Sequence, residues 1–414
     1  MTALSVLEAE RGLAAGRLEL PLWLVGRLTQ LSEHELELAD AEVERSYRLE
    51  VQAPPEIRVG DLVRVCLGAR SGERVVTALE RCAVGRLGAG EHGRRLGRRL
   101  RVRSAALRQV RAYFDAQDFL EVDTPVRVPA PGLDLHVDAL PAGDQWLITS
   151  PEHHMKRLLV AGALRIYQIA HASRAEELGP RHEPEFLLLE WYRAYAGMQE
   201  VMDDTEELVR AVARVAQADL PEADAEPQDQ PQDQLRVGER LIDLTRPFLR
   251  ISVREAFARH AGVTDVVALA RDDEDTYFDL LVGQVEPALA ALDRPIFLHG
   301  YPLSQASLAR PDPADPGTAE RFELYLAGVE LCNGFGELND AAEQRRRYEQ
   351  AQHERRLRNM PVYPLDERFL TALEEGMPPA GGNALGLDRL LMLAMNETNL
   401  DRVLLFPSGS EPIG

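Results

Sequence analysis

The chain has 414 residues, enough for two or three domains, and its 45% hydrophobic and 28% charged residues are typical of a soluble globular protein. Its net charge of −21 argues against a general nucleic-acid binder, which needs a basic face, and is compatible with a basic protein partner. Three cysteines without zinc spacing and an N-terminus without signal-peptide features predict a cytoplasmic protein that does not cross a membrane.

Residues 1–90 are predicted to form a small OB-like β-barrel, because short strand patterns alternate there with turn signals. The expected strands are Leu20–Leu28, Glu35–Leu38, Arg48–Gln52, Asp61–Leu67 and Arg74–Leu79. Barrels of this kind usually bind single-stranded nucleic acid through aromatic side chains in a basic groove. Because this barrel offers only Trp23 and Tyr47, a docking or structural role is favoured over the reading of an anticodon.

Residues 91–414 are predicted to form a second domain of the α+β class. The run Arg94–Arg103 has the spacing of an exposed helix face, which we favour over an RNA-binding patch. An amphipathic helix is expected at Ser104–Phe119. The remaining predictions for this domain are a flexible acidic insert at 221–235, a hairpin at 236–248 before a helix that begins at Ser252, and a helical insert at 263–293.

Charged side chains alternate with apolar ones on both sides of a Gly-Pro turn, a pattern that predicts a β-hairpin. Arg174 and Glu176 are expected to share one face of the first strand, and Leu188, Glu190 and Tyr192 one face of the second. An arginine suits a phosphate because its planar guanidinium binds oxyanions through two hydrogen bonds. Carboxylates suit an ammonium group, so the hairpin predicts a site for both.

A second hairpin is predicted around the turn at Ala327–Gly328, which folds Glu323 and Glu330 towards each other. Two facing carboxylates repel unless a cation lies between them. A few hard oxygen ligands, completed by phosphates, describe Mg²⁺ brought in by ATP. The alternative is a pair of solvated acids on an edge strand.

Beyond this turn, Asn333, Phe335 and Glu337 alternate onto one face and offer an amide, an aromatic wall and an acid to a long alkyl-ammonium chain. Farther along, glycines precede a strongly apolar helix. Gly386 lets a ligand approach the backbone, and Arg389 needs an anionic partner. A buried junction between strand and helix would show the same pattern.

The chain contains 46 arginines and a single lysine, Lys156. A GC-rich genome that encodes arginine wherever a cation is needed explains this bias without any function. The alternative is that an ammonium group is specifically required at Lys156, inside Ser150–Leu159.

The first hairpin resembles motif 2 of the class II aminoacyl-tRNA synthetases, in the form found in their lysine subgroup. The segment from Ser104 to Pro125 resembles motif 1, the dimer-forming element, and Gly381–Leu393 resembles motif 3. Four segments resemble more specifically the elongation factor P–(R)-β-lysine ligases, synthetase paralogues that modify a protein lysine in place of tRNA: Thr149–Val160, Glu190–Arg193, Ser304–Arg310 and Asn383–Gly386.

This resemblance implies a class II antiparallel sheet flanked by helices, a homodimer, ATP with Mg²⁺, and elongation factor P as the acceptor. The implied catalytic residues are Arg174, Glu176 and Arg389, and the implied magnesium ligands are Glu323 and Glu330. The implied amino-acid site comprises Ser150, Pro151, Glu152, Glu190, Tyr192, Asn333, Phe335 and Glu337. The implied ATP site comprises Arg174, Ala175, Glu176, His182, Glu183, Phe186, Glu330, Leu331, Gly386 and Arg389.

Three features depart from the ligase pattern. Ala175 and Glu183 stand where the family usually has asparagine, and the compact ligases lack an N-terminal barrel. Two alternatives therefore stay open: a lysyl-tRNA synthetase with a reduced anticodon-binding domain, and a catalytically silent paralogue acting as a binding module. The acidic charge and the aromatic-poor barrel disfavour tRNA as the acceptor. The sequence does not decide between α-lysine and (R)-β-lysine, which carry the same distal ammonium.

Overall fold

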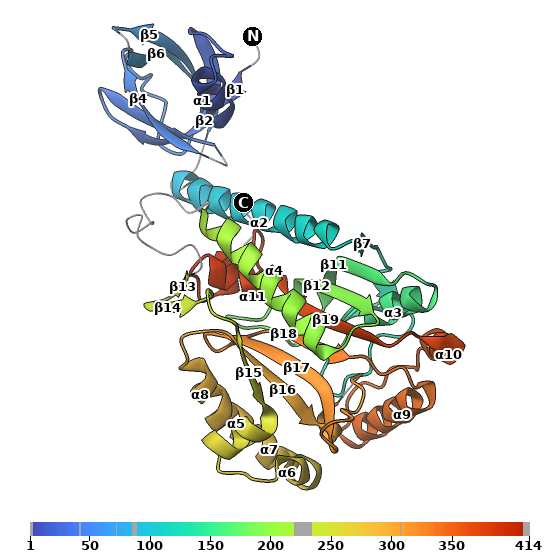
Figure 1. Cartoon of the computed structure of the whole chain (residues 1–414). Coiled ribbons are helices and arrows are strands. Elements are labelled where there is room, and N and C mark those ends of the chain that lie inside the picture. The colour runs from blue at the N-terminus through green and yellow to red at the C-terminus, as the bar shows by residue number, and fades with distance from the viewer. Residues whose placement is uncertain are drawn as a thin grey trace. The chain divides into compact units, whose positions relative to one another are not determined.

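The computed structural model describes residues 3–40, 43–71, 73–84, 89–218, 234–306 and 308–408 (Figure 1). The chain divides into two compact units, residues 1–105 and 106–414, and each is described by itself. In the described residues, no helix is long and apolar enough to cross a membrane.

The N-terminal unit contains a closed β-barrel, as predicted. Strands β2, β3, β4, β6 and β5 follow one another in this order, and β5 pairs with β2 to close the ring. Buried aliphatic side chains such as Leu24, Leu28 and Val65 fill it. The elements are β1 (Leu4–Ser5), α1 (Val6–Ala14), β2 (Leu22–Leu31), β3 (Glu35–Ala39), β4 (Glu44–Leu49), β5 (Leu62–Arg70) and β6 (Glu73–Ala83).

Two details of this unit bear on its function. The strand expected at Arg48–Gln52 lies earlier, at β4, because its backbone pairs with β3 along Glu44–Arg48. Tyr47 is buried in the barrel core and donates a hydrogen bond to Glu10 at 2.9 Å. Its ring is therefore not available to stack on a base.

The long helix α2 (Ala89–Ala116) contains both the arginine run and most of the helix predicted at Ser104–Phe119. The structure describes no side chains for residues 89–96. At the C-terminal end of α2, Phe114 is fully buried and stacks on Tyr167, with ring centroids 4.4 Å apart. This contact fastens the end of the helix to the central sheet.

An eight-stranded sheet organises the second unit, in the order β15-β16-β17-β18-β19-β12-β11-β7. The pairs from β16 to β11 are antiparallel, and only the outermost pairs, β15–β16 and β11–β7, are parallel. The strands are β7 (Leu120–Glu121), β11 (Arg165–Ser173), β12 (Glu185–Ala194), β15 (Leu249–Ser252), β16 (Ile296–Pro302), β17 (Thr318–Leu326), β18 (Val329–Gly336) and β19 (Ala380–Gly386).

Helices α4 and α11 pack on this sheet (Figure 1), so the predicted α+β class is confirmed. The helices are α3 (Glu152–Val160), α4 (Met198–Ala218), α5 (Val253–His260), α6 (Val266–Asp272), α7 (Glu274–Leu280), α8 (Glu286–Ala290), α9 (Ala341–Leu357), α10 (Glu367–Gly376) and α11 (Leu387–Ala394), with short 3₁₀ or π turns at Leu281–Val285, Leu303–Gln305 and Leu400–Arg402. Short strands complete the unit: β8 (Arg127–Val128), β9 (Pro141–Ala142), β10 (Gln145–Leu147), β13 (Gln234–Val237) and β14 (Arg240–Asp243).

Most sequence predictions for this unit agree with the structure. Strands β13 and β14 form the expected hairpin, and Ser252 caps α5 by accepting a hydrogen bond from the Glu255 N–H. Helices α6, α7 and α8 occupy the predicted helical insert. The acidic insert lies largely outside the described residues, and its predicted end, at 234–235, already belongs to β13.

The prediction that Arg174 and Glu176 share a strand face is wrong. Strand β11 ends at Ser173, and Glu176 adopts a positive φ of 62°, which no extended strand contains. Both residues therefore lie in the loop that joins β11 to β12. Alternation in the sequence could not reveal this, since a turn residue can carry the same side-chain pattern.

Candidate active site

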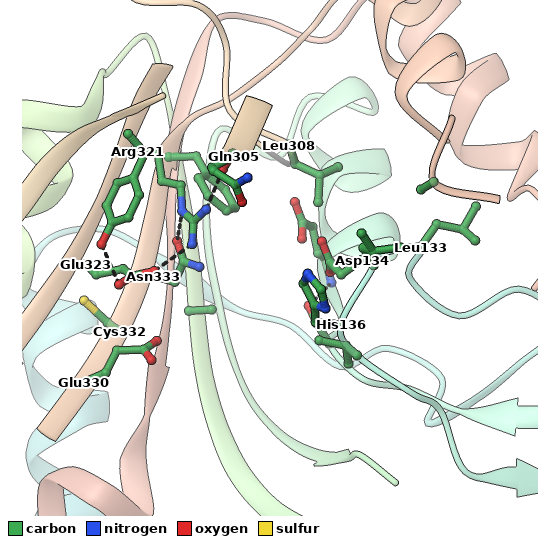
Figure 2. A pocket seen from close by; sticks show the side chains of 18 of the residues that line it. Leu133, Asp134, His136, Gln305, Leu308, Arg321, Glu323, Glu330, Cys332 and Asn333 are labelled. Atoms are coloured by element: carbon green, nitrogen blue, oxygen red, sulfur yellow. Dashed lines mark hydrogen bonds and ion pairs between the residues drawn. The ribbon is translucent and has the colours of Figure 1, made fainter. Parts of the chain in front are cut away.

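A cavity of about 1150 Å³ opens in the second unit. Figure 2 shows side chains of β17 and β18, among them Arg321, Glu330 and Asn333, on one side of it. Asp134 and His136 face them from a loop on the other side (Figure 2). A cavity of this size accommodates a nucleotide and an amino acid together.

Strand β12 presents the alternation expected from the sequence, with Phe186, Leu188 and Glu190 lining the cavity. The carboxylate of Glu190 accepts hydrogen bonds from the Ser150 hydroxyl at 2.5 Å and the Tyr192 hydroxyl at 3.2 Å. Burial, reinforced by the negative charge of Glu152, raises the pKa of Glu190 to about 8. Glu190 thus stays largely protonated at neutral pH until a cation approaches it.

A buried ionic cluster lies beside Glu190. The Lys156 ammonium is 2.5 Å from Glu152 Oε1 and 2.5 Å from Glu337 Oε2, and both Lys156 and Glu337 are fully buried. Glu152 lines the cavity, whereas Lys156, Glu337 and Tyr192 lie behind its wall. The structure therefore gives Glu337, predicted to face the substrate, an internal lysine as its partner.

Arg174 and Phe186 form a second region of the cavity. The guanidinium carbon of Arg174 lies 5.2 Å from the centre of the Phe186 ring. Arg174 makes one long ion pair, 3.5 Å, with Glu177, and its Nε is buried without a hydrogen-bond partner. An unsatisfied buried donor of this kind fits an anion that the structure does not contain. An aromatic face beside it fits a nucleobase.

The loop after Arg174 only partly matches expectation. Ala175 and Glu176 do not line the cavity, and Glu176 is exposed to solvent. His182 and Glu183 do line it. Burial and the positive charge of Arg389 lower the pKa of His182, so this imidazole is neutral at physiological pH. Glu183 accepts a hydrogen bond from the Ser408 hydroxyl at 2.5 Å and so anchors the loop to the C-terminal segment.

Arg389, from α11, joins several parts of the site. Its Nε donates to the Arg181 carbonyl and its Nη1 to the Glu330 carbonyl, each at 3.1 Å. Arg181 in turn donates to the Gly328 carbonyl at 2.9 Å, in the turn between β17 and β18. Leu331 and Gly386, expected in the ATP site, also line the cavity.

The two acids predicted to bind a metal differ in their surroundings. Glu323 accepts hydrogen bonds at 2.6 Å from each of Tyr301, Tyr325 and Arg321, so its charge is already balanced. The carboxyl of Glu330 is less well compensated, and burial together with the neighbouring Glu323 raises its pKa. In register, Glu330 pairs with Tyr325 and Glu323 with Asn333, so the two acids are diagonal rather than opposite.

Several lining residues were missed from the sequence. Arg321 could have been found, because it precedes Glu323 by two residues and so shares its face of β17. Tyr301, which comes from the neighbouring strand β16, and Asp134 with His136, from a loop, carry no local signal. Pro151 was predicted to bind substrate but does not line the cavity.

The sequence model of a family described as "tRNA synthetases class II (D, K and N)" matches residues 92–410. The chain belongs to this family. The class II fold inferred from three motifs is thereby confirmed, and the matched region contains every residue discussed in the site. The N-terminal barrel lies outside it.

Curated relatives narrow the assignment. The chain is 37% identical over 325 residues to a protein of Hamiltonella defensa named elongation factor P–(R)-β-lysine ligase, which covers 74% of this chain and 93% of the relative. Proteins of the same name from Edwardsiella ictaluri and Haemophilus influenzae are each 39% identical, with 73% of this chain and 93% of the relative covered. The chain is therefore a ligase of the class II synthetase type, within the group that carries this name, as the sequence resemblance indicated.

Proposed function

We propose that the protein activates lysine or (R)-β-lysine with ATP and transfers it to a lysine side chain of elongation factor P in the cytoplasm. In the first step the substrate carboxylate attacks the α-phosphorus of ATP, which yields an aminoacyl-adenylate and pyrophosphate. In the second, the ε-amine of the acceptor lysine attacks the adenylate carbonyl, which yields an amide and AMP and releases a proton. No protein nucleophile is required, and catalysis rests on positioning and charge neutralisation.

The observation that carries this proposal is the pairing of two unlike regions in one cavity. At one end, Arg174 offers a buried, unsatisfied Nε beside the Phe186 ring, which suits a phosphate next to a purine. At the other, Glu152 and Glu190 offer carboxylates that suit ammonium groups. An amino acid held between them would present its carboxylate towards the α-phosphate.

The residues also fit one Mg²⁺ ion. Glu330 faces the cavity with an incompletely balanced charge, whereas Glu323 is already occupied by Arg321 and two tyrosines. Among the described residues, no group of three or more His, Cys, Asp or Glu could hold a metal. This donor set suits Mg²⁺, which takes one or two carboxylates and completes its shell with phosphate oxygens and water. When bound, the ion would neutralise negative charge on the phosphates.

The acceptor separates this proposal from a lysyl-tRNA synthetase. The proposed acceptor is elongation factor P. Two curated relatives, each matched across 93% of its length, are named elongation factor P–(R)-β-lysine ligase. The barrel supports this choice, since Tyr47 is buried in its core and cannot stack on a base. A homodimer is part of the proposal, through the α2 and β7 region that resembles motif 1.

The test is transfer of labelled lysine or (R)-β-lysine to elongation factor P and to lysine tRNA in parallel. We expect one acylated lysine on elongation factor P, negligible charging of tRNA, and adenylate formation that survives deletion of residues 1–90. Efficient charging of tRNA that is lost on this deletion would instead identify a synthetase. Absence of any amino-acid-dependent pyrophosphate exchange would identify a silent binding module.

A further inference from the structure

The buried ammonium of Lys156 is the feature of the site that neither the motifs nor the proposed chemistry explains. Lys156 lies on α3, one turn after Glu152, so the two side chains share a helix face. Glu337 reaches the same ammonium from the end of β18. Arginine serves as the cation everywhere else in this chain, but its wide planar fork differs from a compact ammonium that sits between two carboxylates.

The ionisable groups around Lys156 include more carboxyl groups than cations. Glu152, Glu190 and Glu337 contribute three carboxyl groups, and Lys156 contributes one cation. Arg310 also acts on Glu337, but its guanidinium is paired with Glu320 at 2.7 Å. With all three acids ionised, the cluster therefore carries an excess of two negative charges. Burying such an excess without a counter-ion is costly.

The hydrogen bonding of Glu337 is a second, independent indication that this cluster is incompletely paired. Both of its oxygens are fully buried without a hydrogen bond, and Oε2 forms the ion pair with Lys156 whereas Oε1 does not. Oε1 approaches Gly382 and the Tyr192 ring, where a Cβ on Gly382 would lie only 2.4 Å from it. One oxygen of Glu337 is thus paired with Lys156, while the other packs beside Gly382 and the Tyr192 ring without a donor.

We propose that Lys156 is a positioning residue of the amino-acid pocket, which holds Glu152 and Glu337 in place and limits the charge of the pocket to minus two when all three acids are ionised around a bound cation. A diamino acid brings two ammonium groups and neutralises the two negative charges. An amino acid with a single ammonium group leaves one negative charge unbalanced. This inference rests on the proposed function, because it takes lysine or (R)-β-lysine as the substrate. Lys156 acts through the carboxylates and touches no reacting atom.

The test compares Lys156→Met with Arg157→Met, the same substitution of the next cation on α3. Lysine-dependent pyrophosphate exchange gives KM and kcat for lysine, and a separate titration gives the affinity for ATP. We expect the KM for lysine to rise at least tenfold in Lys156→Met, with ATP affinity and the Arg157→Met values within about twofold of wild type. The loss should shrink as pH rises, because carboxyl groups without Lys156 hold their protons to higher pH.

A double variant tests the charge count itself. Lys156→Met/Glu337→Gln removes one cation and the carboxylate behind the cavity wall, keeps Glu152 and Glu190 in that wall, and so restores minus two. We expect it to bind lysine better than Lys156→Met, or to fold if the single variant does not. An unchanged KM in the single variant, equal losses for lysine and ATP, or a double variant no better than the single would each overturn the inference. If the wild type shows no lysine-dependent exchange, the proposed function fails instead.

Discussion

At the scale of single residues, Glu190 combines burial with a position inside the cavity, and this makes a pH-dependent prediction. Its pKa is raised from 4.5 to about 8 by burial and by Glu152, although Ser150 and Tyr192 hydrogen bonds oppose the change. The folded protein thus holds a proton that the unfolded chain releases. The resulting stabilisation is complete below about pH 4.5 and is lost as the pH rises to about 8.

We therefore expect the free energy of unfolding of wild type to fall across this interval, by at most ~1.4 kcal/mol per pH unit from this group. Denaturant titrations at several pH values should show a flatter profile for Glu190→Gln. Binding of lysine near neutral pH should also release a proton from Glu190, measurable by calorimetry in buffers of different ionisation enthalpy. Identical profiles for the two proteins would show that Glu190 titrates normally.

At the scale of elements, the buried side chain of Arg355 makes several contacts with the loop that carries Asp134 and His136. Arg355, on α9, is fully buried and donates to the carbonyls of residues 134, 135 and 137 at 2.9, 2.9 and 3.3 Å. It also pairs with the Asp138 carboxylate and donates to the Pro361 carbonyl at 2.6 Å. Residues more than 200 positions apart in the chain thereby form one wall of the cavity.

We predict that Arg355→Met lowers the free energy of unfolding by about 3–5 kcal/mol, because it removes the cation paired with Asp138 and leaves several carbonyls without their donor. Hydrogen exchange should accelerate in residues 133–138 before the rest of the unit. The neighbouring exposed Arg356 provides the control, and Arg356→Met should change stability by less than about 0.5 kcal/mol. Unchanged hydrogen exchange in residues 133–138 of Arg355→Met would mean that Arg355 does not hold this loop in place.

Strands and turns were predictable from the sequence, whereas contacts between elements were not. Strand periodicity placed Glu190 on the cavity face of β12, and the Ala327–Gly328 turn was correct, with both residues at positive φ. The contact between Lys156 and Glu337 was not predictable, because it joins a helix to a strand end 181 residues later. Local patterns record which face a side chain occupies, whereas partners across the sheet depend on how the elements pack.

At the scale of the whole molecule, the single lysine has a consequence for an enzyme that makes a reactive adenylate. An aminoacyl-adenylate acylates accessible unprotonated amines. Lys156 is fully buried, and although burial alone lowers its pKa, the Glu152 and Glu337 carboxylates outweigh this and raise the pKa above its usual range. Its nitrogen therefore has neither access to the adenylate nor a free lone pair.

We predict that the purified protein, incubated with ATP and labelled lysine but no acceptor, carries no acylated lysine by peptide mass spectrometry. Arg346→Lys should create an internal acceptor, because Arg346 lines the cavity and its side chain is 61% exposed. Arg259→Lys is the matched control, since Arg259 is equally exposed, at 62%, but does not line the cavity. Preferential labelling at position 346 would mark this rim as accessible to an acceptor amine, whereas label on Lys156 would show that the buried ionic cluster opens during turnover.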